Sequence, residues 1–481
     1  MHIDPAIFRA YDIRGKAGTQ ITEEACGLIG QSFGEEVRKR SGKHTPLVVV
    51  GRDARISSPS FLDALRKGLL LAGCSVVDIG ETPSPVNYFT NCTLKADASA
   101  HVTASHNPGS DNGIKLQLSD AEAFAGEDLQ LLRMDIEKRV THNEQSFDCA
   151  QDRPAIHRQQ QGTSVDAITP YLSHLSKMFR TVGKGMTVVI DCGNGVAGPV
   201  YVQALKNAGC SVIELFTEPD GNFPNHPADP SKHSTLKDLQ AAVLKHKAHL
   251  GLAFDGDGDR LGIVDETGKI RSADEILLLL ARDHMLRHPG SPVIFTVSNS
   301  SILETEILAW GAEPVMCKVG HSHVEHAMRE HRAMLGGEQS GHFFCGEDYY
   351  GFDDAMVAAL HILDIFANKQ TNERTNEEVF SSLFSGFPKV YQSHELRPHC
   401  PDDKKAEIIA AVTKHFAKTH PVNALDGARI DFGNGAWAGI RQSNTSPCIS
   451  ICMEARTEAS LHDVEGTVLS HLRSYPDLTI A

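Results

Sequence analysis

Three long apolar runs recur along the chain, and each is followed by a polar turn and then by a helical pattern of apolar residues. They are LVVVGRDARISS from Leu47, VVIDCGNGVAGP from Val188 and VIFTVSNSSILE from Val293. A second strand-like run with a related start follows each helix: GCSVVDIGETP from Gly73, GCSVIELFTEP from Gly209 and GAEPVMCKVGH from Gly311. Apolar strands that alternate with helices predict sheets covered on both faces and joined by right-handed crossovers. The repeat therefore predicts three similar mixed α/β domains.

The pattern changes near Phe380. In ARIDFGNGAWAGIRQSNTSPCISICMEA, apolar and polar residues alternate on both sides of RQSNTSP, and a helical tail follows. Such alternation is typical of antiparallel strands, so we expect a C-terminal α+β domain. The polar stretch 141–162 is typical of a link between the first two repeats. The expected domains are 1–157, 158–261, 262–381 and 382–481, arranged around a central active-site cleft.

Each repeat also contains a third strand that ends in a loop of unusual composition. ASAHV leads into TASHNP at 103–108, HLGLAF into DGDGDR at 255–260, and RAML into GGEQSGH at 336–342. The loops occupy one topological position, the carboxyl ends of strands, so we expect them to converge on a shared crevice.

The first loop carries an isolated serine, Ser105. The segments 107–109 and 111–113 both have turn-forming sequences, so we expect the chain to reverse around Ser105 and to expose its hydroxyl. An exposed hydroxyl suits a nucleophile or a phosphate carrier, although a serine in a turn is more often a cap or a turn former.

The second loop places three carboxylates at alternate positions, with glycines between them. Hard oxygen donors of this kind suit Mg²⁺, and Arg260 beside them suits a phosphate; the carboxylates are Asp255, Asp257 and Asp259. A calcium EF-hand would place its last ligand at Glu266, but Arg260 stands where that motif needs glycine, and the flanks are strand-like. A solvated acidic turn is the other alternative.

Two further loops offer groups for a sugar phosphate. Glu338 and Ser340 could bind neighbouring sugar hydroxyls, although a plain turn would have a similar sequence. The RQSNTSP loop is either a simple hairpin or a site for a phosphate dianion, with a guanidinium and small donors: Arg441, Ser443, Asn444 and Thr445.

The composition of the chain indicates which partners and which cellular location to expect. The eleven cysteines contain no C-x-x-C pair and are expected to be buried thiols. The net charge of −15 argues against nucleic acid or an anionic membrane as the main partner, so positive charge for an anionic ligand must gather locally. No apolar run approaches the roughly 18 residues of a membrane span, and the N-terminus lacks a signal pattern. The cytoplasm is the expected location.

These motifs together resemble the α-D-phosphohexomutase family, and within it the phosphomannomutase/phosphoglucomutase branch. The resemblance covers nearly the whole chain and includes YDIRG from Tyr11, VGRDAR from Val50, TASHNP, DCGNG from Asp191, FPNH from Phe223, DGDGDR, KVGH from Lys318, GEQSGH, GFDDA from Gly351 and RQSNTSP.

The resemblance implies an isomerase that interconverts hexose 1-phosphates and hexose 6-phosphates. In this family the serine that matches Ser105 is phosphorylated and the aspartates bind Mg²⁺, one ion per chain with Ser105 among its ligands. Hexose 1,6-bisphosphate is the intermediate and activator. Glu338 and Ser340 match the sugar-binding positions, and RQSNTSP matches the substrate-phosphate loop. Further matches line the cleft: Tyr11, Arg14, Lys115, His321 and His342.

Several roles stay open at this point. Arg14, Lys115 and His342 are alternative proton acceptors, and His106 supports either the loop or the phosphate. Relatives that use both glucose and mannose phosphates have lysine where this sequence has Ser298. The alternatives are a phosphoglucosamine mutase, a metal-dependent phosphoserine phosphatase and a non-catalytic sugar-phosphate-binding protein. We expect a monomer or weak homodimer.

Overall fold

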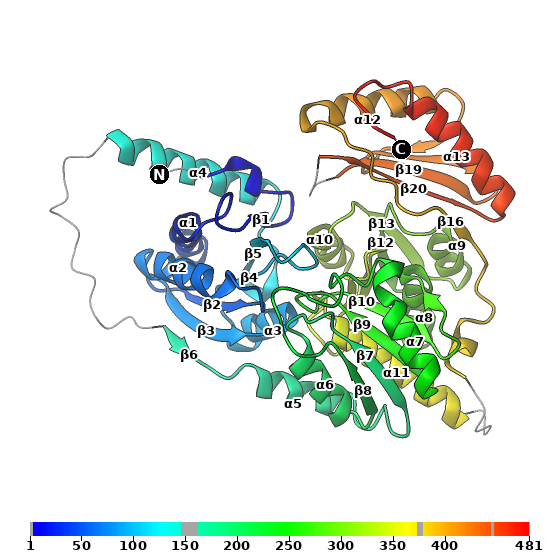
Figure 1. Cartoon of the computed structure of the whole chain (residues 1–481), viewed down its shortest axis with the longest axis horizontal. Helices are drawn as coiled ribbons and strands as arrows, with labels where there is room; N and C mark the ends of the chain where they lie inside the picture. The colour runs from blue at the N-terminus through cyan, green and yellow to red at the C-terminus, as the bar shows by residue number, and fades with distance from the viewer. Residues whose placement is uncertain (1–2, 146–161, 373–378, 444–446, 481) are drawn as a thin grey trace. The chain divides into compact units, whose positions relative to one another are not determined.

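The computed structural model of the chain describes residues 3–145, 162–372, 379–443 and 447–480 (Figure 1). The chain forms two compact units. The first consists of Met1–Ser272 with Ser340–Leu383, and the second of Ala273–Gln339 with Phe384–Ala481. Each unit is described by itself.

The N-terminal sheet of the first unit has the strand order β1-β5-β4-β2-β3-β6. Its centre is parallel, because β2 pairs in parallel with β3 and β4, whereas β5 runs antiparallel to both β4 and β1. The strands are β1 (Ile13–Lys16), β2 (Leu47–Arg52), β3 (Ser75–Glu81), β4 (Ala98–Val102), β5 (Asp111–Leu118) and β6 (Thr163–Ser164).

The helices of this domain include α1 (Glu23–Ser41) and α2 (Ser58–Leu71), which lie side by side (Figure 1). They approach closely at glycine, since a β-carbon on Gly68 would lie 2.1 Å from the carbonyl oxygen of Gly27. The Thr22 hydroxyl accepts from Ala25 N–H at 3.2 Å and so caps α1. The other helices are α3 (Ser84–Leu94), α4 (Glu127–Gln145) and the short η1 (Pro5–Ile7) and η2 (Ser119–Ala121).

The second sheet of the first unit has the order β11-β10-β9-β7-β8, with β7 parallel to β8 and β9 and with β10 antiparallel to β9. Its strands are β7 (Thr187–Asp191), β8 (Ser211–Leu215), β9 (Leu250–Phe254), β10 (Leu261–Asp265) and β11 (Ile270–Arg271). The same unit contains β15 (Phe343–Cys345) and the helices α5 (Ile168–Met178), α6 (Gly198–Asn207), η3 (His233–Leu236), α7 (Lys237–His246) and α11 (Ala355–Asn372).

The second unit combines parallel and antiparallel strands. β12 (Pro292–Thr296) pairs in parallel with β13 (Glu313–Cys317) and β14 (Leu335–Gly337). The helices of this part are α8 (Ala273–Arg287), α9 (Ser301–Ala309) and α10 (His321–His331).

The C-terminal sheet of this unit has the order β16-β20-β19-β18-β17 and is antiparallel. Its buried core includes residues of both covering helices, α12 and α13. The elements are β16 (Tyr391–Gln392), α12 (Asp402–Phe416), β17 (Val422–Asn423), β18 (Ala428–Gly433), β19 (Ala436–Gln442), β20 (Ile449–Ala455) and α13 (Glu458–Leu472). The short η4 (Phe380–Phe384) precedes β16.

The predicted fold class is confirmed, as is the buried state of the ten cysteines in the described part of the chain. Two local predictions are wrong. Segment 111–113 opens β5 instead of forming a turn, because it pairs with β1, and residues 141–145 of the expected link continue α4. The domain limits stay predictions, although β10 and β11 pair within the second sheet beyond residue 261. No helix in the described ranges has the length and apolar character needed to cross a membrane.

Candidate active site

Ser105 follows β4 in a left-handed conformation, with φ at 50°. Its hydroxyl donates to Asp255 Oδ2 at 2.6 Å, and its backbone N–H donates to Thr103 Oγ1 at 2.9 Å. The prediction of an exposed hydroxyl is wrong, because Ser105 is only 1% exposed. The carboxylate loop covers it so closely that a β-carbon on Gly256 would lie 2.5 Å from the Ser105 carbonyl oxygen. A non-glycine residue held at positive φ is a strained conformation of the kind that occurs at functional sites.

Arg55 holds the backbone of the Ser105 loop, a role that was not expected from the sequence. Its side chain is fully buried, with Nε donating to Asp53 Oδ2 at 2.9 Å. The remaining guanidinium donors bond to four carbonyl oxygens of the loop: Ser105 at 2.7 Å, Asn107 at 2.7 Å, Pro108 at 2.6 Å and Asp111 at 3.0 Å. The signal in the sequence was the charged VGRDAR stretch directly after an apolar strand.

The three aspartates of the DGDGDR loop connect β9 to β10 and have no exposed surface. Asp255 Oδ1 shapes the loop by accepting the backbone N–H groups of Gly258, Asp259 and Arg260 at 3.0, 3.0 and 3.2 Å. One oxygen from each aspartate lies within 4.8 Å of the others. Asp257 Oδ1 is buried and has no hydrogen-bond partner among the described residues. The donor set fits a hard divalent cation, and the flanking strands do not fit an EF-hand.

Lys115 of β5 lies against this carboxylate loop. Its Nζ donates to Asp257 Oδ2 at 2.7 Å and also to Asp259 Oδ2. Burial favours the neutral amine, but the two carboxylates raise the pKa of Lys115 well above its ordinary value. Burial and the two neighbouring carboxylates raise the pKa of Asp255 well above its ordinary value. Even beside Lys115 and with Arg260 Nε 3.9 Å from Asp255 Oδ2, burial and the crowding of three carboxylates keep the pKa of Asp255 high, and a bound cation would relieve this repulsion.

His342 and Ser340 also belong to the first unit, next to the carboxylate loop. Leu261 N–H donates to the Gly341 carbonyl at 2.9 Å, which fixes the end of the GGEQSGH loop beside DGDGDR. His342 Nε2 lies 3.3 Å from Asp259 Oδ1 and 3.3 Å from Arg260 Nε. The Ser340 hydroxyl lies 3.0 Å from His342 Nδ1. Parts of all three predicted loops thus converge.

Arg14 and His106 both contact the loop that carries the serine. Arg14 comes from β1 and donates to the Ala104 carbonyl at 3.3 Å and to Asn107 Oδ1 at 3.2 Å. Tyr11 stands three residues before Arg14 and is half-buried. His106 Nδ1 lies 3.2 Å from Ser105 Oγ. Burial, reinforced by nearby cations including Arg260 and Arg14, lowers the pKa of His106 well below its ordinary value, so the ring is neutral.

The second unit contains the other predicted sugar-binding residues. Glu338 directly follows β14 and is buried, and its Oε1 accepts the Gly320 N–H at 2.7 Å. His321 is the first residue of α10 and is also buried. The ends of β13 and β14 therefore lie together, as the pattern of strand ends predicts.

The predicted phosphate loop begins at the end of β19. Ser443 is buried; its hydroxyl accepts from Arg397 Nη2 at 3.0 Å and its carbonyl from Lys405 Nζ at 2.9 Å. Both cations were missed in the sequence, where no local motif connects them to RQSNTSP. The Arg441 Nε is buried and has no hydrogen-bond partner within the described residues. The other predicted ligands, Asn444 and Thr445, lie outside the described residues.

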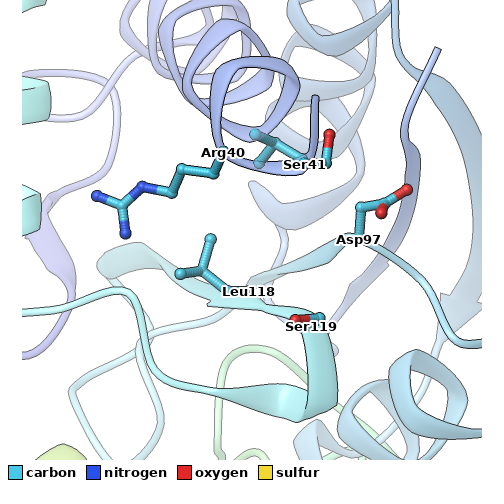
Figure 2. Close-up of a pocket in the computed structure, with 6 residues that line it drawn as sticks. Arg40, Ser41, Asp97, Leu118 and Ser119 are labelled. Atoms are coloured by element: carbon cyan, nitrogen blue, oxygen red, sulfur yellow. The ribbon is translucent and has the colours of Figure 1, made fainter. Parts of the chain in front are cut away.

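A separate polar pocket lies in the N-terminal domain, between the end of α1 and the end of β5 (Figure 2). Its charged groups already have partners, because Arg40 forms a bidentate pair with Asp128 at 2.9 and 2.5 Å and Asp97 pairs with Lys43 at 2.7 Å. The lining residues are Val37, Arg40, Ser41, Asp97, Leu118 and Ser119. We assign no ligand to this pocket.

A buried serine bonded to a carboxylate loop that fits a divalent cation is an arrangement suited to phosphoryl transfer. The sequence matches one family over four domains described as phosphoglucomutase/phosphomannomutase. They are alpha/beta/alpha domain I over residues 5–144, domain II over 169–268, domain III over 272–385, and the C-terminal domain over 395–470.

Individual relatives agree with this match. A phosphomannomutase/phosphoglucomutase of Pseudomonas aeruginosa is 39% identical over 470 residues, which cover 98% of this chain and 96% of that protein. A phosphoglucomutase of Neisseria gonorrhoeae is 34% identical, with 98% of each chain covered. A solved phosphoglucomutase/phosphomannomutase family protein of Burkholderia thailandensis superposes with a TM-score of 0.85 at 34% identity, covering 99% of both chains. The chain belongs to the phosphoglucomutase/phosphomannomutase family of isomerases.

Proposed function

We propose that this protein interconverts the 1-phosphates and 6-phosphates of mannose, glucose or both, through a phosphorylated Ser105 and a hexose 1,6-bisphosphate. One observation carries this proposal. The Ser105 hydroxyl is held at 2.6 Å from Asp255, inside a buried loop of three carboxylates. A serine that only ended a strand would not need a hydrogen bond to a buried carboxylate such as Asp255.

The metal in this proposal is one Mg²⁺ ion per chain, held by Asp255, Asp257, Asp259 and the phosphorylated Ser105. The unpartnered Asp257 Oδ1 supports this ligand set. When bound, Mg²⁺ supplies positive charge that neutralises the transferring phosphoryl group.

The chain's own residues carry the transfer. The bond between Ser105 Oγ and phosphorus breaks and a bond from phosphorus to a sugar hydroxyl oxygen forms. The hydroxyl proton passes to an acceptor, and the released Ser105 oxygen takes up a proton from that acceptor. Of the three predicted acceptors, we propose His342, because the raised pKa values of Arg14 and Lys115 keep both of these groups protonated. Arg260 stabilises charge on the phosphoryl group, and neutral His106 orients the Ser105 loop. The bisphosphate then turns and returns its other phosphoryl group to Ser105, which also explains its proposed role as activator.

The remaining residues hold the substrate. Glu338 and Ser340 accept sugar hydroxyls, and Tyr11 and His321 add contacts to the same sugar phosphate. The phosphate that does not react binds Arg441, Ser443, Asn444 and Thr445. Hexose phosphates are the partners we propose, for a monomer or weak homodimer that binds neither nucleic acid nor membrane.

The deciding experiment compares the wild type with Ser105→Ala on glucose 1-phosphate and mannose 1-phosphate, with Mg²⁺ and a trace of hexose 1,6-bisphosphate. We expect a loss of turnover of at least about a thousandfold, because the variant lacks the phosphoryl carrier. Ser110→Ala is the matched control, since Ser110 is an exposed hydroxyl of the same loop. Near-normal turnover by folded Ser105→Ala would overturn the mechanism.

The same assay distinguishes the alternatives. Preferred turnover of glucosamine phosphate would assign the protein to the phosphoglucosamine branch. Release of inorganic phosphate without isomerisation would indicate a phosphatase. Binding of sugar phosphates that is unaffected by Ser105→Ala, without turnover by the wild type, would indicate a binding protein.

A further inference from the structure

One short segment of the C-terminal domain, residues 426–429, bonds to the ends of two parallel strands within the second unit. The strands are β12 and β13, and the end of the third strand, β14, carries Glu338. The segment contributes two side chains to these bonds, Asp426 and Arg429. All of these residues lie in Ala273–Gln339 and Phe384–Ala481, the two parts of the second unit.

Arg429 forms hydrogen bonds with the backbone that follows β12. Its Nη1 donates to the carbonyl of Asn299 at 2.9 Å and also to the carbonyl of Val297, on either side of Ser298. The guanidinium carbon lies 3.6 Å from the centre of the buried Trp437 ring. Arginine suits this position because its planar group can stack on an indole while it donates in its own plane.

Asp426 fixes the end of β13. Its Oδ2 accepts the Val319 N–H at 3.1 Å. The next backbone N–H, from Gly320, donates to Glu338 at 2.7 Å. Two consecutive backbone N–H groups therefore bond to Asp426 of the C-terminal domain and to Glu338, the carboxylate proposed to bind the sugar.

A second layer of buried polar contacts supports the junction. Glu454 accepts Trp437 Nε1 at 3.0 Å and the Ser301 hydroxyl at 2.7 Å. Asn299 donates to the buried Asp274 at 2.8 Å. A shift at this junction would separate these buried partners, and an unpaired buried polar group is costly.

The pairing of β18 with β19 connects Arg429 to the proposed phosphate loop, which follows β19. Arg429 pairs with Gly439, and Ala428 with Ile440, in the antiparallel ladder of β18 and β19. β19 then ends at Gln442, and Ser443 follows it. Only a few residues of a regular strand separate the Arg429 contact from the proposed phosphate ligand Arg441.

We propose that Arg429 is a positioning residue that holds the phosphate loop at a fixed place relative to the sugar-binding carboxylate Glu338. This inference rests on the proposed function. A phosphate and a sugar ring are joined by bonds of fixed length, so a site that binds both gains affinity when its two halves are preorganised. Arg429 itself need not touch the substrate, because it acts through β19 and through the end of β12.

The test uses full-length Arg429→Met and Arg429→Lys, with Arg473→Met as the control. Arg473 is an exposed arginine that follows α13 in the same domain. We expect Arg429→Met to raise KM about tenfold for the 1-phosphate and for the 6-phosphate, with kcat changed by less than about twofold. Arg429→Lys should raise KM less, and Arg473→Met should not change it. An unchanged KM in folded Arg429→Met, or a loss confined to kcat, would overturn the inference.

A spectroscopic measurement checks the junction without turnover. The chain has two tryptophans, so Trp310→Phe leaves Trp437 as the reporter. In this background Arg429→Met should shift the emission of Trp437, and Arg473→Met should not. Unchanged emission in Arg429→Met would show that the stack does not form and would overturn the inference.

Asp426→Ala provides a second variant if Arg429→Met fails to fold, and it should raise the KM values for the 1-phosphate and for the 6-phosphate. A wild type inactive on all hexose phosphates would reject the proposed function instead.

Discussion

At the scale of single residues, Arg55 shows how a charge can lie inside this fold. A guanidinium with no exposed surface loses its hydration, and that cost is offset only when its donors are bonded. Arg55 meets this condition with bonds to Asp53 and to carbonyls of the Ser105 loop. Its geometry is therefore coupled to the position of the proposed nucleophile.

We expect Arg55→Lys to lower the free energy of unfolding of the first unit by about 2–4 kcal/mol, because one ammonium group cannot bond to Asp53 and to all four loop carbonyls at once. Denaturant unfolding measures this change. Arg52→Lys is the control, since Arg52 is 22% exposed and pairs with Glu81, so its substitution should cost less than about 1 kcal/mol. Equal losses in both variants would contradict the role of Arg55.

The residue scale also shows what the sequence could predict of the site. Ser105 and the three aspartates have local signals: a lone serine before a turn and carboxylates at alternate positions. The burial of Ser105 has no such signal, because it depends on Asp255, which lies 150 residues away. Arg397 and Lys405 were missed for the same reason, since only folding brings them to Ser443.

At the scale of elements, the start of α11 contains a buried carboxylate with many donors. Asp354 accepts the N–H groups of Met356 and Val357 at 3.0 and 3.1 Å, and the hydroxyls of Tyr349 and Tyr171 at 2.8 and 3.1 Å. Burial nevertheless raises the pKa of Asp354 to about 6. The folded protein thus binds this proton more tightly than the unfolded chain does.

The sign of the pH effect follows from this shift. A raised pKa stabilises the folded state below the ordinary value of 3.8, and this stabilisation is lost as pH rises through about 6. Relative to Asp354→Asn, the wild type should therefore lose about 2.4 kcal/mol of unfolding free energy between pH 4 and pH 7. Denaturant unfolding at both pH values measures the difference. The exposed Asp63→Asn is the control, and a constant difference for Asp354→Asn would contradict the effect.

The β9–β10 loop makes a prediction about metal binding. Its three buried carboxylates lie within 4.8 Å of one another beside Lys115 and Arg260, so Mg²⁺ should stabilise the folded protein, by about 2.7 kcal/mol at a hundredfold excess over Kd. Thermal unfolding should shift upward with MgCl₂ and less than half as much in Asp257→Asn. NaCl at equal ionic strength is the control, and excess EDTA should abolish turnover. An equal shift in Asp257→Asn would rule out this ligand set.

The elements themselves were the most predictable part of the fold. The apolar runs at β2, β7 and β12 correspond to parallel strands, since a strand covered on both faces has few polar positions. The prediction for segment 111–113 was wrong. Its residues favour turns when considered alone, but β1 pairs with them, with Lys16 opposite Asp111 and Gly15 opposite Asn112. Tertiary pairing overrode local preference.

At the scale of the whole molecule, the proposed site residues come from both units. Ser105, the aspartates and His342 belong to the first, whereas Glu338 and Arg441 belong to the second. The GGEQSGH motif is itself divided, because the boundary falls between Gln339 and Ser340. The groups proposed for transfer thus lie in the first unit, whereas those proposed to hold the substrate come from both units, with Tyr11 and Ser340 in the first.

A bisphosphate intermediate must present either end to Ser105 while the other end is held, so the holding group should recognise phosphate and not one face of the sugar. Arg441 suits this task, because its buried Nε has no hydrogen-bond partner in the described part of the chain. We expect Arg441→Ala to raise KM by about 10- to 100-fold for the 1-phosphate and the 6-phosphate alike. It should also increase the escape of hexose 1,6-bisphosphate, which is measured in both half-reactions. Arg473→Ala is the control. A defect confined to one substrate, without extra bisphosphate release, would show that Arg441 serves one orientation and that the holding group lies elsewhere.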